Sequence, residues 1–140
     1  MKLKFVLVPL VVLGFTVGSY ADGENISIID GLKYENQSFI KEYTWKKAVT
    51  HCERMKLGGY NNWRLPRKDE LEKLLTEDKN RGYYIQKKFA NNINGEKYAF
   101  FWTSTEAKKN SSEVWYISMK SGSGGWSDKT NGCYVMCVSK

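Results

Sequence analysis

The sequence predicts an α+β fold, and two observations carry that prediction. Amphipathic patterns of helical period are confined to the first half of the chain, between Thr44 and Leu75. The second half instead carries short aromatic and β-branched runs, separated by clusters of Gly, Ser and Asn. Helices that precede antiparallel strands are typical of an α+β domain. The 140 residues contain no repeat or internal linker, so we expect a single domain.

The N-terminus predicts a signal peptide over residues 1–21. Lys2 and Lys4 precede an apolar run from Phe5 to Val17, and Ser19 and Ala21 form a small-x-small cleavage signal. The run is shorter than the roughly 20 apolar residues that a spanning helix needs. We therefore expect membrane contact only through this export signal, a mature domain over residues 22–140, and a periplasmic or secreted location.

The first elements of the mature domain are a short extended segment and a helix. A first strand or hairpin is predicted by four closely spaced apolar residues: Ile28, Ile29, Leu32 and Tyr34. The helix carries one apolar stripe: Trp45, Ala48, Val49, Cys52 and Met55. We expect Gly58 and Gly59 to end this helix, because glycine adopts a left-handed backbone at little cost.

A second, shorter helix and three strands complete the predicted elements. Pro66 presets the backbone that opens the helix, and its inner face is expected to be Leu71, Leu74 and Leu75. The strands are predicted at three apolar runs: Phe100 to Ser104, Val114 to Met119 and Tyr134 to Val138. The glycine-rich segment from Lys120 to Lys129 is predicted to be a loop.

Four motifs in order give the chain a family resemblance. They are the helix, Gly-Gly turn and Trp-Arg-Leu-Pro segment within Thr44–Leu75, then Phe101–Glu106 (FWTSTE), Val114–Ser118 (VWYIS) and Tyr134–Val138 (YVMCV). From about Asp30 to Val138, the sequence resembles the C-terminal domain of collagen-like bacterial adhesins, a secreted domain distantly related by fold to formylglycine-generating enzymes. The resemblance implies a C-type-lectin-like fold, with two helices packed on a twisted antiparallel sheet and long loops.

The chain departs from the pattern of these adhesin domains at two positions. Arg67 stands where they usually carry a Thr that caps the second helix, so a reciprocal cap with Glu70, contributing about 1 kcal/mol, is expected to be lost. Met136 replaces an Arg before the last cysteine, which removes a charge. The remaining motif residues are expected to be scaffold: Trp45, Trp63, Arg64, Pro66, Glu70, Trp102 and Trp115.

Export would place the three cysteines in an oxidising compartment, where a disulfide is expected. A bridge between Cys133 and Cys137 is sterically poor, because the two lie four residues apart in one extended segment. Of the two remaining pairings, the resemblance implies Cys52 with Cys137, since lectin-like domains commonly join the first helix to the last strand. Cys133 would then be a buried apolar residue, a reactive thiol or the link of a dimer.

The charge of the chain favours an anionic partner. Without Lys2 and Lys4, 20 basic residues oppose 15 acidic ones, so the formal charge of +7 falls to +5. The candidate ligand site is an exposed Trp126 flanked by Lys120 and Lys129, which Lys108 and Lys109 would join if the loops between Thr105 and Asn131 converge. We expect no nucleic-acid partner.

Known catalytic and metal signatures are missing from the sequence. His51 is the single histidine and has no ligand at metal spacing, so we expect no metal or other cofactor. The expected function is a non-catalytic, adhesin-like binding module for an anionic polysaccharide or surface glycan. The alternatives are an enzyme of the formylglycine-generating type with a reactive Cys133, and a structural component of an envelope assembly.

Overall fold

The computed structural model of the protein describes residues 25–39 and 41–140. The predicted signal peptide lies outside these residues. The elements in chain order are β1 (Ile26–Ile29), β2 (Leu32–Glu35), α1 (Trp45–Arg54), α2 (Lys68–Glu72), β3 (Leu75–Asn80), β4 (Tyr83–Ile85), α3 (Lys87–Ala90), β5 (Phe100–Glu106), β6 (Glu113–Ser118), β7 (Ser123–Asp128) and β8 (Val138–Ser139).

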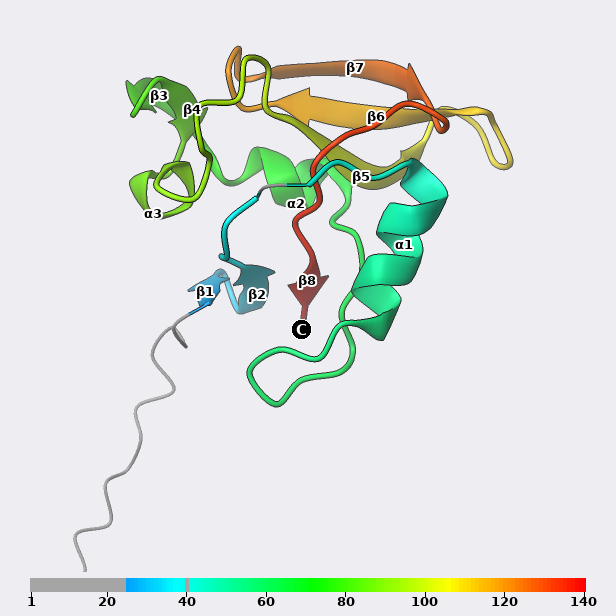
Figure 1. The fold of residues 1–140 in the computed structure, drawn as a ribbon, viewed down its shortest axis with the longest axis horizontal. Helices are drawn as coiled ribbons and strands as arrows, with labels where there is room; N and C mark the ends of the chain where they lie inside the picture. Colours follow the sequence, from blue (N-terminus) through cyan, green and yellow to red (C-terminus); the bar gives the residue numbers. More distant parts are fainter. Residues whose placement is uncertain (1–24, 40) are drawn as a thin grey trace, which may run out of the picture.

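The strands form three small antiparallel sheets, in the orders β1-β2-β8, β3-β4 and β5-β6-β7. In Figure 1, α1 lies on one side of the molecule, α3 with β3 and β4 lies on the other, and α2 lies between them. The mixed composition confirms the predicted α+β class. The expected arrangement of two helices on one sheet was wrong, because the described residues form three helices and their strands are divided among separate sheets.

The predicted hairpin is confirmed as β1 and β2, but the first helix ends earlier than expected. α1 stops at Arg54, and Met55 is its C-cap. Gly58 and Gly59, at φ +60° and +80°, instead form the tight turn that pairs Leu57 with Tyr60. Both glycines have the expected left-handed backbone, but they lie in a loop after the helix and do not end it.

Several elements of the later chain differ from the prediction. α2 ends at Glu72, and Leu75 begins β3, which was not predicted. β4 and α3 were also not predicted. The glycine-rich segment predicted as a loop contains β7, because backbone pairing with β6 compensates for the weak strand preference of glycine. Of the predicted last strand, Val138 alone belongs to an element, β8.

The central sheet β5-β6-β7 separates two hydrophobic cores, because successive side chains of a strand point to opposite faces. Phe101 and Ile117 lie in the first core, together with Leu71 of α2 and Leu74, which follows that helix. Trp102 lies in the second core, against Ala48 and Cys52 of α1. Among the residues that the structure describes, no helix is long and apolar enough to span a membrane.

Candidate functional site

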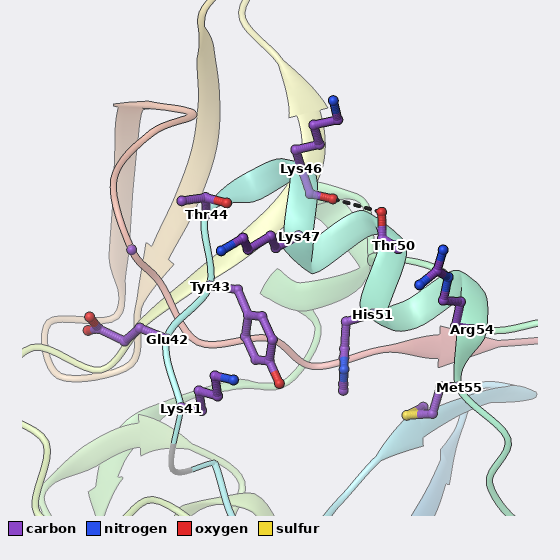
Figure 2. A pocket seen from close by; sticks show the side chains of 11 residues that line it. Lys41, Glu42, Tyr43, Thr44, Lys46, Lys47, Thr50, His51, Arg54 and Met55 are labelled. Carbon is purple, nitrogen blue, oxygen red and sulfur yellow. Dashed lines mark hydrogen bonds between the residues drawn. The ribbon is translucent and has the colours of Figure 1, made fainter.

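A cavity of about 960 Å³ lies beside α1, and we call it the basic groove. One wall is the outer face of α1, and the other is the segment 41–44 that precedes the helix (Figure 2). The groove is named for five of its lining residues, which are basic: Lys41, Lys46, Lys47, His51 and Arg54. This size is in the range of ligand-binding pockets.

The positive charge of the basic groove is poorly compensated. Three lysines and one arginine line it, and Glu42 is the one acidic residue among its lining residues. The four cationic side chains are exposed, and none forms an ion pair with any residue in the described part of the chain. The groove therefore presents several cations to a ligand without first having to break internal salt bridges.

Two rings lie side by side in the groove. The Tyr43 and His51 ring centroids are 5.0 Å apart with an interplanar angle of 33°, and the Lys41 ammonium lies 5.1 Å from the Tyr43 ring centroid (Figure 2). Tyr43 is held by its backbone, because its N–H donates to the Cys133 carbonyl and its own carbonyl accepts from the Cys133 N–H and the Trp102 indole. This wall of the groove is thus anchored to the core.

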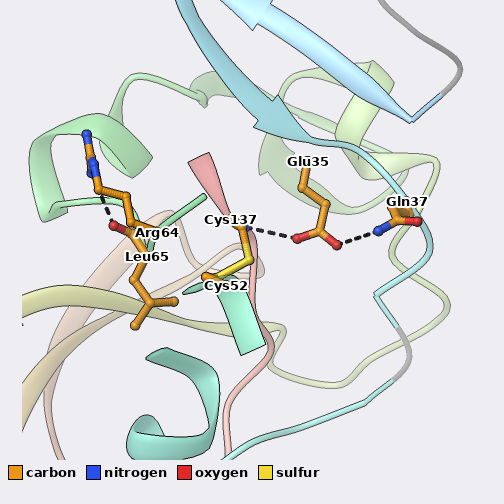
Figure 3. The surroundings of a disulfide bond; sticks show 6 residues. All are labelled: Glu35, Gln37, Cys52, Arg64, Leu65 and Cys137. Atoms are coloured by element: carbon orange, nitrogen blue, oxygen red, sulfur yellow. Dashed lines mark hydrogen bonds between the residues drawn. A yellow bond between two sulfur atoms is a disulfide. The ribbon is translucent and has the colours of Figure 1, made fainter. Parts of the chain in front are cut away.

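The predicted disulfide between Cys52 and Cys137 is present, with Cα atoms 5.5 Å apart (Figure 3). Beside it, the Glu35 carboxylate accepts hydrogen bonds from the Cys137 backbone N–H at 2.9 Å and from the Gln37 amide at 2.8 Å. Burial raises the pKa of the Glu35 carboxyl, although these two hydrogen bonds act in the opposite direction. Donor atoms of Glu35, His51 and Cys137 lie within 4.8 Å of one another, and the Cys137 sulfur among them is bonded to Cys52 in the disulfide.

Cys133 is buried, with 2% of its surface exposed. Burial, followed by the nearby Glu42 carboxylate, raises the pKa of its thiol to about 12. The thiolate is the nucleophilic form of cysteine, so this environment does not activate Cys133.

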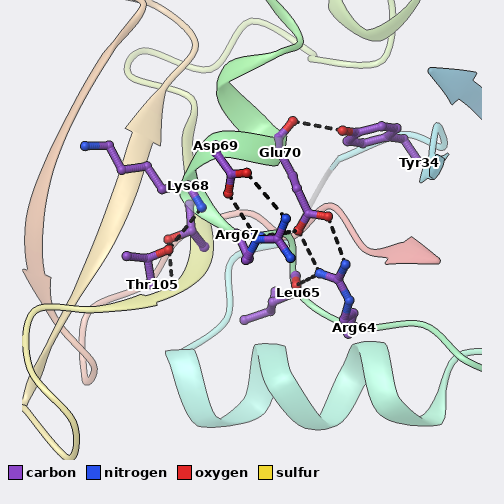
Figure 4. Close-up of polar contacts among 9 residues, drawn as sticks. Tyr34, Arg64, Leu65, Arg67, Lys68, Asp69, Glu70 and Thr105 are labelled. Carbon is purple, nitrogen blue, oxygen red and sulfur yellow. Dashed lines mark hydrogen bonds and ion pairs between the residues drawn. The ribbon is translucent and has the colours of Figure 1, made fainter. Parts of the chain in front are cut away.

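Arg64 and Glu70 form an ion pair beside α2. The Arg64 guanidinium donates to both Glu70 carboxylate oxygens at 2.8 Å, and Glu70 also accepts from the Arg67 backbone N–H at 2.8 Å (Figure 4). Half of the reciprocal cap is therefore retained. The other half requires a side-chain acceptor at position 67, which an arginine does not have.

The other motif residues are also placed in the scaffold. Trp63 and Trp102 are buried in the second core, with Trp45 packed against it, and Pro66 is buried at the entry to α2. Trp115 packs against the first core, and the Lys68 ammonium lies 4.0 Å from its ring centroid.

The structure places Trp126 on β7, where 46% of its surface is exposed and its ring packs edge-on against Trp115, with centroids 4.9 Å apart. Lys120 and Lys129 lie at opposite ends of this strand. Lys120 lies over the Tyr83 ring, whereas Lys129 pairs with Glu106 at 2.9 Å and lies over the Trp45 ring. The two lysines therefore lie against different rings at opposite ends of the strand, and the expected patch around Trp126 is not formed by these contacts.

Lys108 and Lys109 are exposed in the loop between β5 and β6. This loop lies at the Lys129 end of β7, because the Lys129 N–H donates to the Ser112 carbonyl.

The basic groove was not predicted from the sequence. The signal for it in the sequence was the cationic outer face of α1, with Lys46, Lys47 and Arg54 opposite the apolar stripe.

Fold and site together define a small mixed domain of antiparallel sheets and short helices with a cation-lined groove. Residues 28–139 match the family described as the Lcl C-terminal domain, and the chain belongs to this family. The match runs from β1 to β8 and includes both walls of the basic groove. No curated protein matches the chain.

Proposed function

We propose that the protein is an exported, non-catalytic and adhesin-like binding module for an anionic polysaccharide or surface glycan, with the basic groove as its binding site. The proposal includes a C-type-lectin-like arrangement of the domain and a periplasmic or secreted location. The observation that carries it is the row of exposed cations in the groove without ion-pair partners among the described residues. Such cations attract polymers that carry sulfate or carboxylate groups.

The groove combines charge with a surface suited to sugars. Lys47 and Arg54 stand on the helix wall and Lys41 on the opposite wall, so anionic groups spaced along a chain would meet cations on both sides. The adjacent Tyr43 and His51 rings offer an apolar face between them. Aromatic faces and charged groups in one cavity supply both stacking and ion pairing.

Burial of Cys133 and the raised pKa of its thiol argue against the alternative of a formylglycine-generating type of enzyme. That chemistry would require an accessible thiolate. The same burial argues against a Cys133-linked dimer, since a buried sulfur cannot reach a second chain without local opening.

The test is retention of the mature protein on immobilised heparin or fucoidan, eluted with a salt gradient. The groove variant is Lys47→Ala with Arg54→Ala, and its matched control is Lys108→Ala with Lys109→Ala. Each double variant removes two exposed positive charges, so net charge changes equally. Loss of two surface ion pairs weakens binding by roughly 0.5–2 kcal/mol, or about 2- to 30-fold.

We expect the groove variant to elute at clearly lower salt than the control, and all retention to disappear in moderate salt because of screening. Lack of retention of the unmodified protein at low salt would rule out anionic polymer binding. A larger loss in the Lys108 and Lys109 variant would instead move the site to the β5–β6 loop and Trp126, where Trp126→Ala would then weaken binding.

A further inference from the structure

A cluster of metal-ligand side chains lies next to the basic groove, around the disulfide. The Glu35 carboxylate at the end of β2, the His51 imidazole of α1 and the Cys137 sulfur before β8 supply donor atoms within 4.8 Å of one another. The Cys52 sulfur is bonded to the Cys137 sulfur (Figure 3). It is therefore the fourth potential ligand atom of the cluster.

We propose that reduction of the Cys52–Cys137 disulfide converts this cluster into a four-ligand site for a divalent metal ion of the zinc type. Two thiolates, one imidazole and one carboxylate are a donor set that Zn²⁺ prefers, with bonds of about 2.0–2.3 Å. Bonds of this length place tetrahedral donors roughly 3.3–3.8 Å apart. Three of the four donors already lie within 4.8 Å of one another, so side-chain shifts that draw them closer, together with separation of the two sulfurs, complete the site.

Two features of the surroundings suit a metal ion. A cavity of about 180 Å³ is lined by Glu35, His51 and Val135. It leaves room for an ion beside the Glu35 carboxylate and the His51 imidazole. The His51 ring nitrogens form no hydrogen bond with any residue among those described, so a lone pair is free to coordinate. Lys41 also lines this cavity, but it is exposed and extends over the Tyr43 ring.

The state of the disulfide controls the site. While the bridge is closed, neither sulfur is a thiolate. The Glu35 carboxylate and the His51 imidazole are then the two remaining strong donors of the cluster. A dithiol reductant opens it by exchange: one thiolate attacks a bridge sulfur, the second thiol resolves the mixed disulfide, and the reductant leaves as its own disulfide. Cys52 and Cys137 gain the two electrons and two protons, and metal binding then releases those thiol protons to solvent.

The test measures Co²⁺ and Zn²⁺ binding to the mature protein before and after reduction, with the reductant removed under anaerobic conditions. Tetrahedral thiolate coordination of Co²⁺ gives visible absorption, and near-ultraviolet circular dichroism reports whether the reduced chain stays folded. We expect one Co²⁺ per reduced chain, displaced by Zn²⁺, and no such absorption from the oxidised chain. The variant Cys133→Ala should behave identically, because Cys133 is not a ligand.

Two further variants separate a built site from metal capture by free thiols. Glu35→Gln keeps an acceptor for the Cys137 N–H, and His51→Asn removes the imidazole. Each should weaken Co²⁺ binding by about 10-fold or more. Equal binding by the natural chain and both variants would overturn the proposal, as would a reduced protein that binds no metal or that stays unfolded with metal present.

Discussion

At the residue scale, the clearest feature is a buried carboxylate that organises a turn. Glu70 accepts two hydrogen bonds from the Arg64 guanidinium and one from the Arg67 backbone, and its own carbonyl accepts the Tyr34 hydroxyl. Burial acts to raise the pKa of Glu70, but the hydrogen bonds and the two guanidinium charges hold it below its ordinary value. The charged form of Glu70 therefore stabilises the folded protein.

Glu70→Gln should lower the free energy of unfolding by about 1–3 kcal/mol at pH 7, because it weakens charge-assisted hydrogen bonds in a buried turn. The folded-state pKa lies below the unfolded value, so this contribution is present above about pH 4.3 and is lost as pH falls through the folded pKa. Urea unfolding of both proteins at pH 7 and pH 3 measures it.

The matched control for this change is Glu72→Gln, which alters an exposed glutamate of the same helix, 3.8 Å from Lys68. It should cost under about 0.5 kcal/mol. A Glu70→Gln effect that does not shrink in acid would show that lost packing, and not charge, explains it.

At the element scale, β7 depends on the absence of a side chain at Gly124. A Cβ atom built there would collide with the Tyr116 carbonyl and lie 2.7–2.8 Å from atoms of the Trp115 indole. The Lys68 ammonium lies over the Trp115 ring, which also packs edge-on against Trp126. The register of β6 with β7 and the position of Trp126 therefore rest on one glycine.

Gly124→Ala should destabilise the protein by about 2–3 kcal/mol, because β7 must move away from Trp115 to accept the methyl group. Gly125→Ala is the matched control, since its Cβ would approach the Tyr116 hydroxyl at 3.2 Å, and it should cost under about 1 kcal/mol. Thermal unfolding followed by tryptophan fluorescence compares the two. Equal stability of both variants would mean that the edge strand yields without disturbing the sheet.

At the scale of the whole molecule, the disulfide joins elements that are 85 residues apart. It connects α1, which forms a wall of the basic groove, to the chain just before β8. The intervening chain supplies α2, both remaining sheets and α3. The bridge thus constrains most of the unfolded chain.

Removal of the bridge by Cys52→Ala with Cys137→Ala should lower the free energy of unfolding by about 4 kcal/mol, because the unfolded chain regains loop entropy. Guanidinium unfolding in the presence of a chelator measures this without metal binding. Cys133→Ala, which removes a buried cysteine outside the bridge, should cost less. An unchanged guanidinium midpoint of unfolding in the Cys52→Ala, Cys137→Ala variant would show that the bridge does not stabilise the fold.

Local patterns in the sequence were sufficient for the elements that are stabilised by their own residues. The apolar stripe of α1 and a strand or hairpin at β1–β2 were predicted because the spacing of apolar residues acts over a few positions. β7 could not be predicted, because its glycines have weak strand preference and its pairing comes from β6. The end of α1 was misplaced, because glycine is also required in the turn that follows.

The sequence by itself determined the α+β class and, through family resemblance, the Cys52–Cys137 pairing. These follow from short-range periodicity and from a recognisable series of motifs. Only the tertiary structure decided where cations gather and which donor atoms meet. Lys41 and Arg54 line the same groove, and Glu35 meets His51 and Cys137, because separate elements meet beside α1. Such neighbours are far apart along the chain, and no local pattern encodes their distance.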